Sequence, residues 1–130
     1  MNWMIELNPE DFSRVVLNLC KNSFDAMRDK SLLKQDEEYM PTLKVSTRKG
    51  DNYAIIDFED NGPGVSEEVK DKLFQPFFTT KKGTEGTGLG LSITHDIINK
   101  HLGNIKIISK ENHFTRFEIQ LPITTKKTKL

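Results

Sequence analysis

The chain has 130 residues, which is enough for one domain that buries a core without disulfides or metal. Its 19 basic and 19 acidic residues cancel, which excludes a basic body built to coat nucleic acid and an acidic disordered tail. No apolar run approaches the roughly 18 residues of a membrane span, and the first residues lack the features of a secretory signal. Cys20 is the single cysteine, so no internal disulfide can form and a reducing, cytoplasmic compartment is expected.

The first predicted element is a helix over residues 9–30. Pro9 suits a first helical turn, and small and apolar side chains recur along one face at three- and four-residue spacing. That face consists of Phe12, Val15, Val16, Leu19, Ser23, Ala26 and Met27. Residues 31–41 are polar and end in proline, which is typical of a loop.

A β-hairpin is predicted next, with strands over 43–48 and 53–58 and turn-forming residues between them. The sequence Asp60-Asn61-Gly62-Pro63-Gly64 ends the second strand. A short helix capped by Ser66 is predicted to run to about Phe74, and a loop follows over 75–87. A second long helix over 88–101 is ended by Gly103. Two strands over 105–108 and 114–121 come next, and we expect the basic tail over 124–130 to be disordered. Together they predict one domain over residues 1–123, a two-layer sandwich with helices on one face of a sheet.

Polar side chains interrupt the first helix at a regular spacing. Asn18 and Asn22 stand one turn apart and Asp25 follows three residues later, so the three share a face. Two amide oxygens at this spacing suit a hard cation or phosphate-bound water. The alternative is an ordinary solvated helix face.

Asp60 comes where an apolar strand ends, so its carboxylate can lie partly buried at the sheet edge. A carboxylate there accepts a hydrogen bond from an exocyclic amine such as that of adenine, whereas the carbonyl oxygen of guanine is repelled. Gly62 and Gly64 leave room for a flat base to approach the backbone. The alternative is a plain Asp-Asn-Gly turn.

Residues 83–91 are rich in glycine and lead into a helix, which is typical of an anion site. The stretch is not a Walker A loop, because Leu89 stands where a lysine is required. Just before it, residues 74–82 combine three phenylalanines with Lys81 and Lys82, which could reach phosphates from a movable lid. The alternatives are a flexible loop with a helix cap, core phenylalanines and surface lysines.

Taken in order, these stretches resemble the four sequence boxes of the ATP-binding domain of sensor histidine kinases, whose superfamily includes gyrase, mismatch-repair ATPases and ninety-kilodalton heat-shock chaperones. The matching positions are Asn18, Asn22 and Ala26 for the N box, Asp60, Gly62, Gly64 and Val65 for the first glycine box, Phe74, Pro76, Phe77 and Phe78 for the F box, and Gly86, Thr87, Gly88, Leu89, Gly90 and Leu91 for the second glycine box. The amino-acid sequence of residues 76–81 is most similar to that of the nitrogen-regulation branch of histidine kinases.

The resemblance implies the superfamily's α/β sandwich, with a mixed, mostly antiparallel sheet and ATP bound between the helices and a lid over residues 66–87. It implies that Asn22 coordinates Mg²⁺ and acts in catalysis with Asn18, with Lys21 a possible substitute for the lysine that many relatives carry where Asp25 stands. The implied adenine contacts are Asp60, Gly62, Gly64, Val65 and Thr115. The implied phosphate contacts are Lys81, Lys82, Gly86, Thr87, Gly88, Leu89, Gly90 and Leu91.

Asn18 occupies the position where ATPases of the superfamily carry a glutamate base. An amide has no useful basicity near neutral pH, so slow hydrolysis and transfer to another acceptor are expected. The resemblance implies an acceptor histidine on a separate dimerisation domain, a response regulator as partner, and a monomeric state for this domain. His95, His101 and His113 lack the context of such an acceptor. The alternatives are a stand-alone anti-sigma-type serine kinase and a degenerate kinase that serves only as an interaction module.

Overall fold

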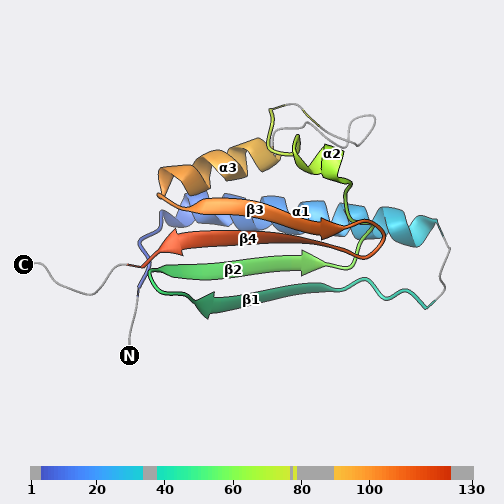
Figure 1. Ribbon diagram of the computed structural model, residues 1–130, viewed down its shortest axis with the longest axis horizontal. Coiled ribbons are helices and arrows are strands. Elements are labelled where there is room, and N and C mark those ends of the chain that lie inside the picture. The colour runs from blue at the N-terminus through green and yellow to red at the C-terminus, as the bar shows by residue number, and fades with distance from the viewer. Residues whose placement is uncertain (1–3, 34–37, 77, 79–89, 124–130) are drawn as a thin grey trace, which may run out of the picture.

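The protein is a four-stranded antiparallel sheet covered on one face by two helices, as seen in the computed structural model (Figure 1). The structure describes residues 4–33, 38–76, 78 and 90–123. Its elements are α1 (Pro9–Leu32), β1 (Leu43–Lys49), β2 (Tyr53–Asp60), α2 (Glu67–Lys70), α3 (Gly90–Lys100), β3 (Asn104–Lys110) and β4 (Phe114–Pro122). The strand order is β1-β2-β4-β3, and every pairing among these strands is antiparallel.

Helix α1 forms for the local reasons that the sequence indicates. Asn8 caps it by accepting a hydrogen bond from the Asp11 backbone N–H at 3.0 Å, and Pro9 opens its first turn. The face predicted from the spacing is the buried one: Val15 and Leu19 are fully buried and Met27 nearly so. The helix ends at Leu32, two residues later than predicted.

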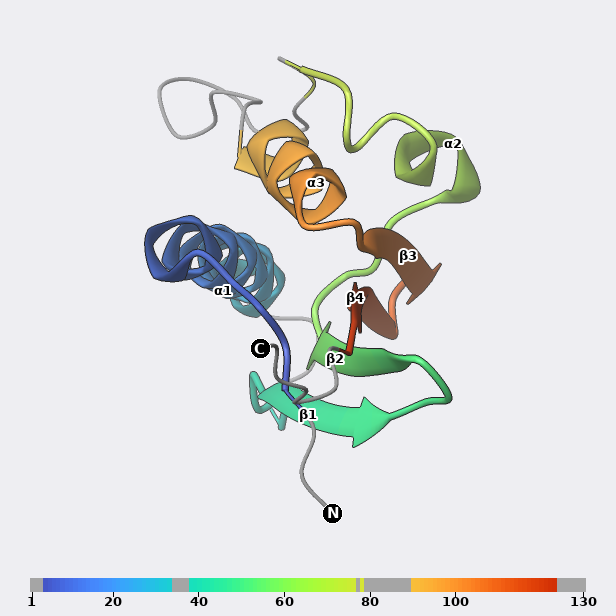
Figure 2. The ribbon, with the colours of Figure 1, turned by 90° about the vertical axis from the view of Figure 1, so that its left-hand side faces the viewer.

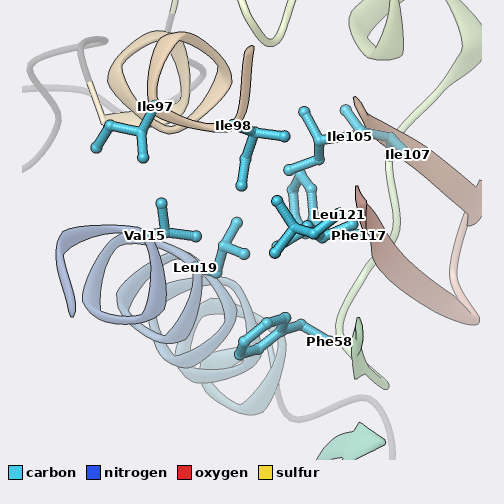
Figure 3. Close-up of a cluster of buried hydrophobic side chains, with 10 residues drawn as sticks. Val15, Leu19, Phe58, Ile97, Ile98, Ile105, Ile107, Phe117 and Leu121 are labelled. Carbon is cyan, nitrogen blue, oxygen red and sulfur yellow. The ribbon is translucent and has the colours of Figure 1, made fainter. Parts of the chain in front are cut away.

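The core lies between the sheet and the two long helices, which Figure 2 shows end-on above one face of the sheet. Alternate residues of β4 point to this side, including Phe117, Ile119 and Leu121, as expected for a strand with one buried face. They pack with side chains from α1, β2, α3 and β3 (Figure 3). On the other face, Arg48 of β1 pairs with Glu118 of β4 at 2.8 Å. The predicted fold class is therefore confirmed.

Two short-range predictions need correction, at the ends of α2 and α3. Ser66 caps α2 by accepting from the Val69 N–H at 3.2 Å, although α2 proper ends at Lys70 and only turns follow. The residue with left-handed backbone after α3 is Leu102, with a φ of 62°, and not Gly103. Gly103 is needed for another reason: a Cβ there would overlap the carbonyl oxygen of Gln120.

Two predictions fall outside the described residues, namely the basic tail over 124–130 and most of the loop over 75–87. Among the described helices, none has both the length and the apolar character needed to cross a bilayer.

Candidate functional site

Asp60 ends β2 with its carboxylate buried, since only 3% of the residue is exposed. Its Oδ2 accepts a hydrogen bond from the Ser23 hydroxyl at 2.8 Å, and its Oδ1 accepts one from the Gly62 N–H at 2.8 Å. Burial raises the pKa of Asp60 above its ordinary value of 3.8, while the two hydrogen bonds and the charge of Lys30 oppose that rise. The carboxylate is thus costly to bury and firmly oriented.

The same carboxylate keeps capacity to bind a ligand. A carboxylate oxygen has about two acceptor positions, and each oxygen of Asp60 uses one on the protein. An amine that approached the end of β2 could donate to an unused position. This is the chemistry that the sequence predicted for recognition of adenine.

Thr115 lies beside Asp60, and Val65 is linked to Thr115 through Ser109. Thr115 is the direct partner of Asp60 in the β2–β4 ladder, and its hydroxyl lies 3.3 Å from the Ser109 hydroxyl. The Val65 N–H donates to that same Ser109 oxygen at 2.9 Å. Among the described residues, the hydroxyl that bonds the carboxylate directly belongs to Ser23.

The two glycines after Asp60 are required by close protein neighbours. A Cβ on Gly62 would lie 2.8 Å from Asp60 Oδ1, the atom that the Gly62 N–H bonds. Gly64 has a φ of 70°, and a Cβ there would overlap the carbonyl oxygen of Lys110, the last residue of β3. Gly62 therefore allows the turn to fold back on Asp60, and Gly64 allows it to pack against the neighbouring hairpin.

The polar side chains of α1 differ in whether they already bond to described protein groups. The Asn18 amide donates to the Gly90 carbonyl at 3.2 Å and to the Thr94 hydroxyl at 3.3 Å, so it joins α1 to the start of α3. Asn22 is half-buried and makes no side-chain hydrogen bond within the described part of the chain. The Lys21 ammonium pairs with Asp25 at 2.9 Å and is thereby committed to its own helix.

Of the predicted phosphate contacts, the described residues include only Gly90 and Leu91. Gly90 opens α3, and Leu91 packs partly buried against the core. Lys81, Lys82, Gly86, Thr87, Gly88 and Leu89 lie outside the described residues. Phe74, from the F box, has its ring 5.1 Å from that of His95 on α3, so the segment before this loop contacts the helix after it.

Three site residues were not predicted as such: Ser23, Lys30 and Tyr39. Ser23 stood on the predicted buried face of α1, and a buried hydroxyl needs a partner, which was the available signal. Lys30 follows Ser23 by two helical turns and so shares its face. No sequence pattern pointed to Tyr39, because its contacts depend on how the segment before β1 folds.

The chain belongs to an ATPase family. Residues 7–125 match the family described as histidine kinase-, DNA gyrase B- and HSP90-like ATPase, which covers most of the sequence. The buried, oriented carboxylate at the end of β2 and the polar face of α1 therefore lie in a domain of ATP-binding type.

Its relatives include sensor histidine kinases. The chain is 36% identical over 122 residues to the sensory histidine kinase/phosphatase NtrB of Salmonella typhimurium, covering 89% of this chain and 33% of NtrB. It is 31% identical over 119 residues to the sensor histidine kinase ZraS of Escherichia coli, covering 92% of this chain and 23% of ZraS. The solved catalytic domain of histidine kinase ThkA matches with a TM-score of 0.72 and 33% identity, over 91% of this chain and 70% of that one.

The chain is thus homologous to the catalytic domains of sensor histidine kinases, as the four sequence boxes predicted. It spans about a third of the length of NtrB.

Proposed function

We propose that this domain binds Mg-ATP and transfers the γ-phosphoryl group to a histidine on a separate dimerisation domain. The observation that carries the proposal is the Asp60 carboxylate, which is buried and held by two hydrogen bonds that leave one acceptor position on each oxygen unused. Gly62 and Thr115 adjoin Asp60 at the end of β2, and Gly64 and Val65, which follow along the chain, are proposed to complete the adenine site. In this role Asp60 favours adenine over guanine, whose carbonyl oxygen would face the carboxylate.

The residues of α1 fit a magnesium-bound triphosphate. Magnesium prefers oxygen ligands, and the Asn22 amide oxygen has no competing partner among the described residues. We assign Asn22 as the protein ligand, where the ion would supply charge neutralisation for the phosphates. Lys21 is a weaker candidate for a phosphate contact, because reaching a phosphate would cost its ion pair with Asp25.

Asn18 favours transfer over hydrolysis. Its amide cannot take a proton from water near neutral pH, and its N–H groups already donate to Gly90 and Thr94. Phosphoryl transfer depends mainly on positioning and charge neutralisation, which this site can provide without a protein base. The backbone of residues 86–91, with Lys81 or Lys82, is proposed to hold the phosphates.

The test is a transfer assay with separate domains. The chain is incubated with labelled Mg-ATP and with the histidine-bearing dimerisation domain of NtrB, and the acid-labile phosphate on that domain is measured. Label on the added domain, absent when its histidine is replaced by alanine, is the expected result. Label that appears on serine would contradict the proposal and favour the anti-sigma-type serine kinase.

In a longer protein, the response regulator of a two-component system would take the phosphoryl group from that histidine. A monomeric state for the isolated domain and a cytoplasmic location remain predictions.

A further inference from the structure

The turn after Asp60 is held by a lysine from the C-terminal part of α1. The Lys30 ammonium donates to the carbonyl oxygen of Asn61 at 3.2 Å and to that of Gly62 at 3.4 Å. These are the two carbonyl groups that follow Asp60 directly, and both reach the same ammonium. Lys30 therefore binds the main chain of the turn, whereas Ser23 binds the Asp60 side chain.

Tyr39 completes the contact from the segment before β1. The Lys30 ammonium lies 4.6 Å from the centre of the Tyr39 ring, a cation–π distance. The Tyr39 hydroxyl donates to Asn61 Oδ1 at 3.3 Å. Asn61 is thus held through its main chain by Lys30 and through its side chain by Tyr39.

Asn61 in turn joins this segment to the turn. Its Oδ1 accepts from the Thr42 N–H at 2.9 Å, its Nδ2 donates to the Met40 carbonyl at 2.9 Å, and its own N–H donates to the Thr42 carbonyl at 3.2 Å. Its side-chain oxygen and nitrogen and its backbone N–H and carbonyl oxygen are all engaged. A shift of the turn would therefore break several hydrogen bonds together, which makes the turn stiff.

One face of α1 positions the whole turn. Ser23, Met27 and Lys30 recur at three- and four-residue spacing and so point the same way. Ser23 bonds the Asp60 carboxylate, and a Cβ on Gly62 would stand 3.5 Å from Met27 Cγ, at ordinary contact. Lys30 then bonds the carbonyl groups of Asn61 and Gly62, so the three residues hold the turn from its first residue to its last.

We propose that Lys30 is a positioning residue for nucleotide binding, which with Tyr39 fixes the turn of residues 60–62 so that Asp60 meets the adenine amine in a preset orientation. The proposal rests on the adenine-binding function proposed above for Asp60. Lys30 acts through the turn, because its contacts are with protein groups. Preorganisation of this kind improves affinity by removing the cost of ordering the site when the ligand binds.

The charge of Lys30 gives the proposal a second, independent readout. Besides the hydrogen bonds from Ser23 and Gly62, the titratable groups that act on Asp60 are Lys30 from α1, Glu59 from β2 and Tyr39 from the segment before β1. Lys30 lowers the pKa of Asp60 and Glu59 raises it, whereas Tyr39 is neutral in the acidic range. Loss of the ammonium therefore raises the pKa of Asp60 further, and loss of the Tyr39 hydroxyl does not.

The experiment is a calorimetric titration of the 130-residue chain with ATP over a range of pH. Lys30→Met keeps the aliphatic stem and removes the ammonium. Lys44→Met is the matched control, because Lys44 is exposed on β1 and has no polar partner among the described residues. Lys30→Met is expected to bind ATP about tenfold more weakly, the loss typical of a hydrogen bond to a charged group.

The acid limb of the binding profile is the pH range in which ATP affinity falls as the pH is lowered. In Lys30→Met this limb is also expected to move to higher pH, while Lys44→Met follows the wild type. Lys30→Arg keeps the charge and should restore the position of that limb. Tyr39→Phe should weaken ATP binding with the limb unmoved. Wild-type affinity in Lys30→Met would overturn the proposal, as would weaker binding with an unmoved limb. Should Lys30→Met fail to fold, wild-type affinity in Tyr39→Phe would overturn it instead.

Asp60→Asn, titrated alongside, separates the two proposals. If it loses ATP binding while Lys30→Met does not, the role of Lys30 is wrong and the adenine site stands. If Asp60→Asn binds ATP as the wild type does, the adenine site itself is wrong, and the role of Lys30 with it.

Discussion

The hydroxyl of Ser23 donates a 2.8 Å hydrogen bond to Asp60 Oδ2, and this contact joins the middle of α1 to the end of β2. Both residues are almost completely buried, with 1% and 3% exposed. A hydrogen bond to a buried carboxylate stabilises its charged form and orients it. Ser23 thereby offsets part of the burial that raises the pKa of Asp60.

Ser23→Ala is expected to weaken ATP binding about tenfold or more, because a buried carboxylate loses a charge-assisted hydrogen bond worth roughly 1.5–3 kcal/mol. The measurement is calorimetric titration with ATP at neutral pH. Ser13→Ala, an exposed serine on the same helix, is the control and should bind ATP as the wild type does. Equal affinities in wild type and Ser23→Ala would show that the hydroxyl does not prepare Asp60 for the ligand.

ATP affinity should fall as the pH is lowered through the raised pKa of Asp60. Only the ionised carboxylate offers acceptors on both oxygens, and burial lifts the pKa above 3.8, so the loss begins at higher pH than for an ordinary aspartate. Titrations with ATP at decreasing pH measure this loss, with the folded state followed by circular dichroism. Affinity that stays constant while the protein remains folded would contradict the role of the carboxylate.

Asp60→Asn should abolish ATP binding without lowering the free energy of unfolding at neutral pH. Since the folded state raises this pKa, it binds the proton more tightly than the unfolded chain does. Stability from this group is therefore present at low pH and falls as pH rises from 3.8 through the raised pKa. The ionised carboxylate is thus a net cost at neutral pH, which the neutral amide removes. Urea unfolding of both proteins at several pH values measures the difference, and a large loss of stability in Asp60→Asn would contradict it.

Replacing Asn18 by alanine should mainly lower thermal stability, whereas replacing Asn22 should mainly weaken Mg-ATP binding. Asn18→Ala removes two hydrogen bonds between α1 and α3, each worth about 1 kcal/mol, so its Tm should fall by several degrees. Asn22→Ala should leave the Tm nearly unchanged and weaken Mg-ATP much more than metal-free ATP. Thermal melts and titrations with and without Mg²⁺ measure both. An equal loss of affinity in the two conditions would show that Asn22 does not hold the ion.

Gly64→Ala should destabilise the fold by about 1–3 kcal/mol, because the residue has a positive φ and a Cβ would overlap the Lys110 carbonyl oxygen. Gly90→Ala is the matched control. A Cβ there would meet Asn18 Cγ at 3.7 Å, an ordinary contact, and alanine favours a helix. Denaturant unfolding compares the two variants. A Gly64→Ala protein as stable as Gly90→Ala would contradict the strain assigned to this turn.

The sequence predicts those parts of the fold that follow from local periodicity. Val15 and Leu19 lie at helical spacing and are buried as predicted, and strands are predicted correctly where β2 and β4 form. The pairing of β2 with β4 is not predicted, because it joins distant parts of the chain. The end of α3 shows the limit. Gly103 is expected to end the helix, yet the residue with left-handed backbone is Leu102. Gly103 is needed instead where the chain passes Gln120.

The site residues also divide into those that the sequence predicts and those that it does not. Asp60 and Asn22 are singled out by sequence motifs, and Asp60 is buried more completely than the partial burial expected. The residues that hold Asp60 do not follow from motifs, because their contacts join distant parts of the chain. Ser23 and Asp60 are 37 positions apart, and Lys30 and Asn61 are 31 apart. Such pairings depend on how α1 crosses the sheet, which the spacing of residues along α1 does not specify.

The measurement that tests the central claim most directly is a calorimetric titration of the 130-residue chain with ATP and then with GTP, each with and without Mg²⁺. The Asp60 carboxylate should accept from the adenine amine and repel the guanine carbonyl oxygen. Binding of ATP, strengthened by Mg²⁺, with no detectable binding of GTP is the predicted result. Equal binding of the two nucleotides, or binding of neither by the folded chain, would contradict the assignment of Asp60 as the adenine acceptor.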